Sequence, residues 1–380
     1  NTCAFIEAAR RESVDTILEL DGARRPGSRL VVTGCLAERY GTELADALPE
    51  ADRVAGFGVP VTLRPRNAFD LLNLSRPPAA APWAYVKVAE GCDRRCGFCA
   101  IPSFRGRQRS RSLEAVLGEV EQLGPAVREV VLVAQDLASF GLDRAGADGD
   151  RPRRYPSRPI VELVRAVGAL VDRVRLLYLY PSSLDDALID AVVGTGVPYF
   201  DLSLQHVSAP LLRRMRRWGS GARFLERIAQ IRAGAPEAAL RSSFIVGYPG
   251  ETEEDHGQLL RFLEQAQLDW AGFFTFSEER GTHAAGLPGK VPAALALERL
   301  RECADVQDEI TAERRAALVG SAMAVLVDAP GTARSHREAP EIDGVVHVPH
   351  GLRPGSLVDV VATGAAGPDV WAAPAVAGLR

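Results

Sequence analysis

Residues 83–106 read WAYVKVAEGCDRRCGFCAIPSFRG. Within this stretch a short apolar run, Tyr85–Ala89, predicts a buried strand that leads directly into a loop containing Cys92, Cys96 and Cys99. Three thiolates on one loop can wrap one face of a cubane iron–sulfur cluster and leave one iron without a protein ligand. We therefore predict that this loop binds a 4Fe-4S cluster.

The same loop has two other possible uses, a structural zinc site and a disulfide. Zinc usually takes four ligands, and no fourth Cys or His lies near the loop. Three cysteines cannot pair evenly, and no secretory signal is visible that would favour disulfides. The open iron of a three-cysteine cluster can instead bind a small molecule through nitrogen and oxygen, as the amino and carboxylate groups of S-adenosylmethionine (SAM) would. Gly91 and Gly97 would let the backbone turn closely around the cluster.

Strands and helices alternate from this loop onward. The predicted strands are Tyr85–Ala89, Glu129–Ala134, Val174–Tyr180, Tyr199–Leu204, Ser242–Val246 and Trp270–Phe276. The predicted helices between them are Leu113–Leu123, Ile160–Val171, Leu184–Val193, Pro210–Arg217 with Arg223–Ala233, and Glu253–Ala266. Six strand–helix units in series predict a parallel sheet with right-handed crossovers, curved into a partial barrel. In such sheets the chemistry lies at the carboxyl ends of the strands.

Each end of the chain predicts a further unit. Residues 1–59 predict a small α/β unit, with helices at Ala4–Leu20 and Glu38–Leu48 around a strand at Arg29–Thr33. Residues 60–82 are rich in proline and arginine and predict a linker to a core over residues 83–317, which ends in a charged helix, Pro292–Leu318. Residues 318–380 predict a small β-barrel. Its expected strands are Ala324–Asp328, Gly344–Val348 and Leu357–Val361.

Composition places the chain in a broad class. It has 380 residues, 47% hydrophobic and 25% charged, with a net charge of −4. No apolar run is long enough to span a bilayer, so we expect no membrane association and a cytoplasmic location. The first residue is Asn1 rather than Met, and we expect that N-terminal residues are missing. The net charge gives no global basic field that would indicate nucleic-acid binding.

Several motifs along the chain resemble one known family. Besides Gly91–Gly106, they are Asn1-Thr2-Cys3-Ala4-Phe5-Ile6, Val32-Thr33-Gly34-Cys35, Ala134-Gln135-Asp136, Leu204-Gln205-His206, Gly247-Tyr248-Pro249-Gly250-Glu251-Thr252 and Ala339–Gly344. Together they resemble the radical SAM methylthiotransferases, and most closely the branch that methylthiolates an aspartate of the twelfth small-subunit ribosomal protein. The resemblance covers nearly the whole chain. One departure is Ser203, where the family usually has proline, and it affects the expected local turn.

The resemblance implies a fold and a set of cofactors. The fold is a partial (β/α)6 radical SAM barrel between an N-terminal methylthiotransferase domain and a C-terminal TRAM-type barrel. The cofactors are SAM and two 4Fe-4S clusters, with Cys92, Cys96 and Cys99 holding the cluster that binds SAM. Cys3 and Cys35 would be two of three ligands of the second cluster, whose remaining ligand would lie upstream of Asn1, leaving this cluster incomplete in the present chain. On spacing alone, Cys3 and Cys35 would instead be small buried residues at strand ends.

The resemblance also implies SAM contacts at the carboxyl ends of two strands and in the cysteine loop. The expected SAM-binding residues are Phe98, Gln135, Asp136, Gly247, Pro249 and Gly250. Thr252 would cap the helix that begins at Glu253. Each residue alone also fits an ordinary strand–helix loop. His206 could point into the site or be a satisfied structural histidine, and Cys303 is expected to be a packed small residue.

The implied reaction is radical SAM methylthiolation of an aspartate β-carbon, with no catalytic side chain beyond the clusters. Sulfur would pass through the second cluster, and a second SAM would supply the methyl group. The implied partners are a small-subunit ribosomal protein, a reductase or flavodoxin-type electron donor, and an unknown sulfur donor. The alternatives are a tRNA adenosine methylthiotransferase, a radical SAM enzyme that inserts no sulfur, and a non-enzymatic iron–sulfur protein.

Charge in the tail bears on the choice between protein and tRNA. An RNA-binding face should be basic. Residues 318–380 contain four arginines and six acidic residues, a net charge of −2. This balance favours a basic protein partner, unless the arginines gather on one face. Two arginine groups, residues 105–111 and 213–217, are either solvated surface or a basic rim around the cleft.

Overall fold

The computed structural model describes residues 2–4, 6–56, 79–144 and 158–375, which form two compact units. The cysteine unit consists of Asn1–Arg76, Gly91–Arg107 and Ser277–Leu287, and the barrel unit of Pro77–Glu90, Gln108–Phe276 and Pro288–Arg380. Three segments that are distant along the chain therefore build the cysteine unit. The predicted linker, residues 60–82, lies mostly outside the described residues. Among the described residues, no helix is both long and apolar enough to cross a membrane.

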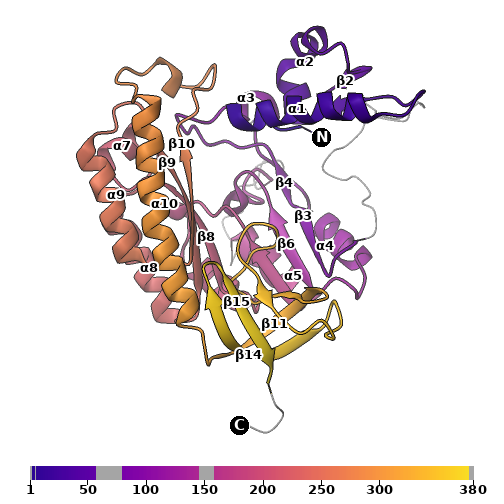
Figure 1. Cartoon of the computed structure of the whole chain (residues 1–380), viewed down its shortest axis with the longest axis vertical. Helices are drawn as coiled ribbons and strands as arrows, with labels where there is room; N and C mark the ends of the chain where they lie inside the picture. Colours follow the sequence, from indigo (N-terminus) through magenta and orange to yellow (C-terminus); the bar gives the residue numbers. More distant parts are fainter. Residues whose placement is uncertain (1, 5, 57–78, 145–157, 376–380) are drawn as a thin grey trace. The chain divides into compact units, whose positions relative to one another are not determined.

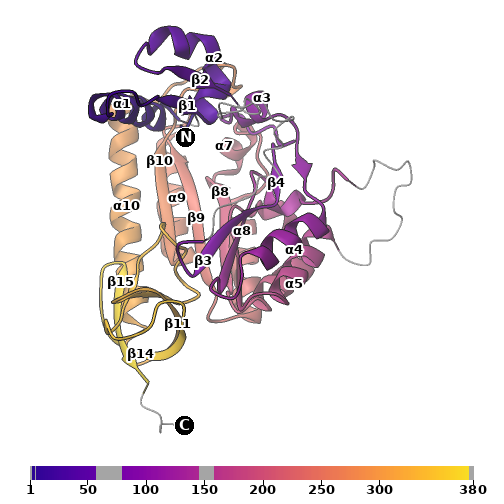
Figure 2. The same ribbon diagram turned by 90° about the vertical axis from the view of Figure 1, so that its right-hand side faces the viewer.

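The cysteine unit contains a short parallel sheet of two strands (Figures 1 and 2). β1 (Val31–Thr33) pairs in parallel with β2 (Arg53–Ala55), and Thr2 forms a parallel bridge to Gly34. Two helices, α1 (Glu7–Ala23) and α2 (Cys35–Ala47), contribute to one apolar core with these strands. Helix α1 begins three residues later than predicted, because Thr2 forms a strand-like bridge and Ile6, directly before the helix, is still extended.

The barrel unit contains the six predicted parallel strands. One sheet has the order β3-β6-β7 and the other has the order β10-β9-β8. A parallel bridge between Leu179 and Leu202 joins the two sheets. The bounds of the strands are β3 (Trp83–Lys87), β6 (Glu129–Val133), β7 (Arg173–Leu176), β8 (Tyr199–Gln205), β9 (Ala239–Val246) and β10 (Trp270–Thr275). The strand order confirms the predicted partial barrel.

Helices cover the outer faces of these strands (Figures 1 and 2). They are α4 (Leu113–Gln122), α5 (Pro159–Gly168), α6 (Asp186–Val193), α7 (Ala209–Arg214), α8 (Gly221–Gly234), α9 (Glu253–Ala266) and α10 (Ala293–Ala316). Five of them begin at a side-chain cap, provided by Ser112, Asp185, Ser208, Ser220 and Thr252. Each cap satisfies an otherwise unpaired backbone N–H and is typically worth about 1 kcal/mol. The predicted cap at Thr252 is confirmed and belongs to a capping box with Asp255.

Ser203, the departure from the resembling family, lies inside β8. Its backbone N–H donates to the carbonyl of Leu179 at 3.0 Å, beside the bridge that joins the two sheets. Proline has no N–H and could not form this bond. The serine therefore adds one hydrogen bond where the two halves of the barrel meet.

The C-terminal strands close into a small barrel with the order β11-β12-β13-β15-β14. The bounds are β11 (Ala322–Ala329), β12 (Thr332–Arg334), β13 (Val346–His347), β14 (Leu357–Ala366) and β15 (Asp369–Pro374). Valines from β11, β13 and β14 fill its interior together with Ala333 of β12 and Ala372 of β15. The three predicted strands are confirmed, but β12 and β15 were missed. β12 has only three residues, which are too few to show an alternating pattern. β15 ends in a proline, a residue that argues against a strand in sequence-based prediction.

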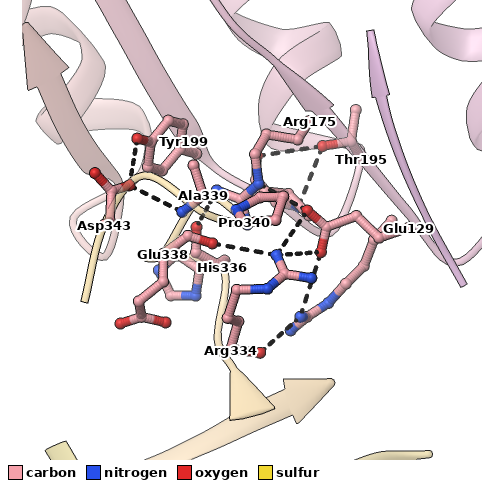
Figure 3. A network of polar contacts seen from close by, with 12 residues as sticks. Glu129, Arg175, Thr195, Tyr199, Arg334, His336, Glu338, Ala339, Pro340 and Asp343 are labelled. Atoms are coloured by element: carbon pink, nitrogen blue, oxygen red, sulfur yellow. Dashed lines mark hydrogen bonds and ion pairs between the residues drawn. The ribbon is translucent and has the colours of Figure 1, made fainter. Parts of the chain in front are cut away.

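A segment that starts at the last residue of β12 and leads toward β13, residues 334–343, contacts the amino ends of the parallel strands (Figure 3). Ala339 is fully buried against Val131, Tyr199 and Trp270. The indole N–H of Trp270 donates to the Arg337 carbonyl at 2.6 Å, and the Tyr199 hydroxyl donates to the Asp343 carboxylate at 2.6 Å. The segment therefore covers the end of the barrel opposite to the carboxyl ends of its strands.

A buried charge network fixes this segment in place (Figure 3). Glu129, the first residue of β6, accepts a hydrogen bond from Arg175 at 2.7 Å and two from Arg334 at 3.2 Å. All three side chains are at most 3% exposed. Burial alone would raise the pKa of Glu129, but the guanidinium groups of Arg175, Arg334 and Arg173 outweigh it and lower the pKa to about 2. Glu129 is therefore an ionised carboxylate that needs its arginine partners.

Candidate active site

The cysteine loop follows β4 (Ala89–Glu90) and belongs to the cysteine unit. Gly91 has φ +79, and a Cβ there would lie 2.2 Å from the carbonyl oxygen of Arg107, so only glycine fits. The Cys92 N–H donates to the Gly106 carbonyl at 3.1 Å and closes the base of the loop. The loop is thus anchored at both ends, and the SAM candidate Phe98 lies within it.

The donor set of this loop fits an iron–sulfur cluster. Cys92, Cys96 and Cys99 are all partly exposed, and the Arg94 N–H donates to the Cys92 sulfur at 3.4 Å. Hydrogen bonds to sulfur are one of the means by which proteins tune a cluster. Within the described ranges, no three His, Cys, Asp or Glu side chains are grouped so as to hold a single metal ion. A cubane cluster is larger than a single metal ion, so its three cysteine ligands are farther apart. Three thiolates spaced along one loop suit such a cluster.

Cys3 and Cys35 follow two adjacent parallel segments of the cysteine unit. The Thr2 N–H donates to the Thr33 carbonyl at 2.8 Å, and the Cys35 N–H donates to the Thr2 carbonyl at 2.9 Å. Gly34 has φ 104 and ψ −162, a conformation that essentially only glycine adopts. Because the carboxyl ends of paired parallel strands meet at one edge, the two cysteines lie on the same edge of the sheet.

Helix α3 (Ile101–Arg105) connects the two cysteine sites. It begins two residues after Cys99, and its Arg105 donates to the Cys35 sulfur at 2.6 Å. The segment 277–287 adds a further link, because the Ala284 N–H donates to the Gly97 carbonyl at 2.8 Å. The cysteine unit therefore holds all five predicted ligands in one body, although residues 3 and 99 are far apart in sequence.

Glu279 holds the segments of the cysteine unit together. Its side chain is 2% exposed and pairs with Arg10 of α1 at 2.6 Å and with Arg39 of α2 at 2.8 Å. Burial acts to raise its pKa, but hydrogen bonds from Ser277 and the two arginines produce a net lowering. Glu279 was not predicted from the sequence, because its two arginine partners are more than 200 residues away along the chain.

The remaining SAM candidates lie in the barrel unit, at the carboxyl ends of β6 and β9. Gln135 and Asp136 follow β6, and Asp136 is 4% exposed and accepts from the Ser139 hydroxyl at 2.7 Å. The Gln135 side-chain oxygen is buried and has no hydrogen-bond partner among the described residues. Gly247, Pro249 and Gly250 form the loop after β9. The sequence predicted both positions from the order of the strands.

His206 and Glu251 lie behind the β9 loop, and both are fully buried side chains. His206 Nδ1 accepts from the Ser208 N–H at 3.1 Å, and Nε2 lies 4.0 Å from Glu251 Oε1. Burial raises the pKa of Glu251 to about 7, although Arg299 and the N–H groups of Gly247 and Tyr248 oppose this shift. Glu251 was not singled out from the sequence, where it was only part of a motif.

The pKa of His206 predicts a pH-dependent stability. Burial lowers this pKa from 6.5 to about 4, with Asp255 opposing the shift and His256 and Arg299 reinforcing it. Folding favours the neutral ring, so His206 contributes stability that is fully present above pH 6.5 and is lost as the pH falls toward 4. Between neutral pH and about pH 5, the wild type should lose about 2 kcal/mol of unfolding free energy relative to His206→Gln, which cannot titrate. Urea unfolding of both proteins at the two pH values tests this, and parallel pH dependence would contradict it.

The two arginine groups do not act as uniform basic surfaces. Arg111 is 6% exposed and pairs with Glu119, and it also donates to the carbonyls of Lys87 and Ala115. Arg217 stacks over the Tyr180 ring with its guanidinium carbon 4.2 Å from the ring centre. By contrast, the Arg107 side chain is 91% exposed. Part of each group therefore supports the fold.

Cys303 is fully buried, as expected, and burial raises the pKa of its thiol to about 12.

Each of the three main parts of the chain matches a known protein family. A model of the Radical SAM superfamily matches residues 86–263, and one of the TRAM domain matches residues 319–374. A model described as Uncharacterized protein family UPF0004 matches residues 1–56.

Curated relatives match along almost the full length. The ribosomal protein uS12 methylthiotransferase RimO of Moorella thermoacetica is 43% identical, over 96% of this chain and 87% of its own length. Relatives with the same name from Frankia casuarinae and Salinispora tropica are 42% and 40% identical; they cover 94% and 98% of this chain, and 78% and 87% of their own lengths. With this identity over nearly its whole length, and with the cysteine loop at the end of the first barrel strand, the chain belongs to the ribosomal protein uS12 methylthiotransferases, a family of radical SAM enzymes.

Proposed function

We propose that this chain methylthiolates the β-carbon of an aspartate in a small-subunit ribosomal protein. The names of its relatives identify ribosomal protein uS12 as their substrate. Such a substrate would place the enzyme in the cytoplasm, with a reductase or flavodoxin-type protein as the electron donor.

The cluster residues have distinct parts in this proposal. Cys92, Cys96 and Cys99 would hold the 4Fe-4S cluster, and Cys3 and Cys35 would be ligands of a second one. Held by these three cysteines, the first cluster would supply the single electron for reductive cleavage of SAM, and with it the capacity to remove hydrogen from an unactivated carbon. The protein binds, orients and shields these groups. Phe98, Gln135, Asp136 and the loop Gly247–Gly250 would contact SAM.

One observation favours a protein substrate over tRNA: two arginines of the tail are engaged in contacts within the chain. Arg334 is 3% exposed and bonds Glu129 and Asp328, and Arg337 pairs with Asp269 at 3.4 Å. Among the described residues of the tail, Arg353 is the one exposed arginine, and it is outnumbered by exposed Glu341 and Asp359. Arg334 and Arg337, which the net charge of the tail includes as possible RNA contacts, thus hold the tail against the barrel instead. An RNA-binding surface needs a basic footprint, whereas an acidic surface suits a basic ribosomal protein.

Direct competition tests the substrate. The reconstituted enzyme is offered the small-subunit ribosomal protein and unmodified tRNA in one reaction, and both products are analysed by mass spectrometry. We expect methylthio transfer to one aspartate of the protein and none to adenosine. Transfer to tRNA but not to the protein would overturn the proposal. A variant with the target aspartate changed to asparagine serves as the matched control, and it should remain unmodified.

A further inference from the structure

The loop after β9 has a path that only glycine permits at two positions. Gly247 has φ +74, and a Cβ there would lie 2.6 Å from the Cβ of Ala296 in α10. Gly250 has φ +85, and a Cβ there would lie 2.8 Å from the guanidinium carbon of Arg214. The Gly250 N–H also donates to the Gly289 carbonyl at 2.7 Å. The loop is therefore closely packed on its protein side, and its geometry depends on what holds its amides.

Glu251 holds the first two amides of this loop. Its Oε2 accepts from the N–H of Gly247 and, at 3.1 Å, from the N–H of Tyr248. Its own N–H donates to the Tyr248 carbonyl at 2.9 Å, which closes the turn. One oxygen thus accepts from two consecutive N–H groups, so a single side chain fixes the direction of this turn.

The other oxygen of Glu251 faces two nitrogen donors. Oε1 lies 3.6 Å from Arg299 Nη1 on α10 and 4.0 Å from His206 Nε2 in the turn after β8. Arg299 is 3% exposed and also donates to the Glu251 carbonyl at 3.4 Å. Neither distance is that of a hydrogen bond, and Glu251 Oε1 and His206 Nε2 have no hydrogen-bond partner among the described residues. Arg299 and His206 therefore act on this oxygen through longer-range electrostatic attraction.

The hydrogen bonds of His206 determine which nitrogen carries its proton. Nδ1 accepts from the Ser208 N–H at 3.1 Å and is therefore unprotonated. The neutral ring must then carry its proton on Nε2, the atom that faces Glu251 Oε1. Ser208 is itself fixed, because its hydroxyl donates to Asp255 and caps α7. His206 therefore presents a donor, rather than an acceptor, to the carboxylate.

We infer that Glu251 is a positioning residue for SAM binding, because its Oε2 fixes the N–H groups of Gly247 and Tyr248 at the start of the loop Gly247–Gly250, while its Oε1 faces Arg299 and His206. This inference rests on the proposed function, since it takes this loop as a SAM contact. Glu251 is fully buried and acts through the loop rather than by touching the reacting atoms. The same arrangement places the Nε2–H of His206 4.0 Å from Glu251 Oε1, where it can influence the orientation of the carboxyl group only electrostatically.

The test uses the full chain with its cluster reconstituted. SAM affinity is measured by equilibrium dialysis, SAM cleavage by 5′-deoxyadenosine formation, and cluster content by iron analysis. In Glu251→Gln, an amide NH₂ replaces one acceptor and opposes the donors of His206 and Arg299. We expect the Kd and the KM for SAM to rise at least about tenfold, with iron content unchanged and kcat at saturating SAM within about twofold.

The matched control is Glu254→Gln, the same change on an exposed side chain at the start of α9 that pairs with Arg261. It should leave the Kd unchanged. A second pair of variants keeps the test independent of how well Glu251→Gln folds. His206→Gln retains a neutral donor near the Nε2 position and should bind SAM within about threefold of wild type, whereas His206→Ala should show a loss of about tenfold.

The outcomes separate this inference from the proposed function. Wild-type affinity in both Glu251→Gln and His206→Ala, with the wild type cleaving SAM, would overturn the positioning role alone. A wild-type protein that neither binds nor cleaves SAM would overturn both. Equal losses of SAM affinity in His206→Gln and His206→Ala would also contradict the inference, because the N–H donor at Nε2 would then not affect SAM binding.

Discussion

Replacing Cys92, Cys96 and Cys99 together with alanine is expected to abolish both the cluster absorbance and the formation of 5′-deoxyadenosine. The three thiols are the proposed ligands of the cluster that supplies the electron for SAM cleavage, and alanine has no atom that binds iron. The loop itself should keep its path, because its anchors at Gly91 and at the Cys92 N–H do not involve sulfur. Iron analysis, visible absorption and product chromatography are the measurements.

Cys303→Ala provides the matched control for this experiment. Cys303 is fully buried in α10 of the barrel unit, so the change removes the same atom at a site with no proposed iron. It should cost modest stability and leave the cluster and SAM cleavage intact. A triple-alanine variant that still formed 5′-deoxyadenosine would disprove the ligand assignment, and the same loss in Cys303→Ala would show that the effect is not specific to the loop.

Glu129→Gln is expected to destabilise the barrel unit by about 3–5 kcal/mol. The substitution keeps the shape of the side chain but leaves Arg175 and Arg334 as buried charges without their shared carboxylate. The affected contacts hold the segment 334–343 against the amino ends of the strands, so the C-terminal barrel should lose its anchor (Figure 3). Urea unfolding followed by circular dichroism measures the change.

Asp172→Asn is the control for Glu129→Gln at the same edge of the sheet. Asp172 pairs with Arg128, but the two side chains are 42% and 35% exposed, so removing the charge should cost no more than about 1 kcal/mol. The pH dependence gives a second check, because the pKa of Glu129 is lowered from 4.5 to about 2. Its contribution should be fully present above pH 4.5 and fade as the pH falls toward 2. Equal stabilities of the two variants near neutral pH would contradict the prediction.

The sequence by itself determined the local features of this protein. The order of strands and helices, the cap at Thr252 and the cysteine loop at the end of the first barrel strand were all readable, because each depends on residues a few positions apart. The carboxyl-end positions of Gln135 and Gly247 followed from the strand order alone. The short β12 was missed because three residues cannot display a period.

The tertiary structure decided which charges meet. Glu129 contacts Arg334 across 205 positions, and Glu279 contacts Arg39 across 240. From the sequence alone, Arg334 and Arg337 could have contacted an RNA or protein partner. In the folded chain Arg334 is buried and Arg337 pairs with Asp269. The role of His206 likewise depended on a carboxylate from a different strand–helix loop. Such contacts leave no local pattern in the sequence, because they arise only when distant segments pack and each buried charge must find a partner.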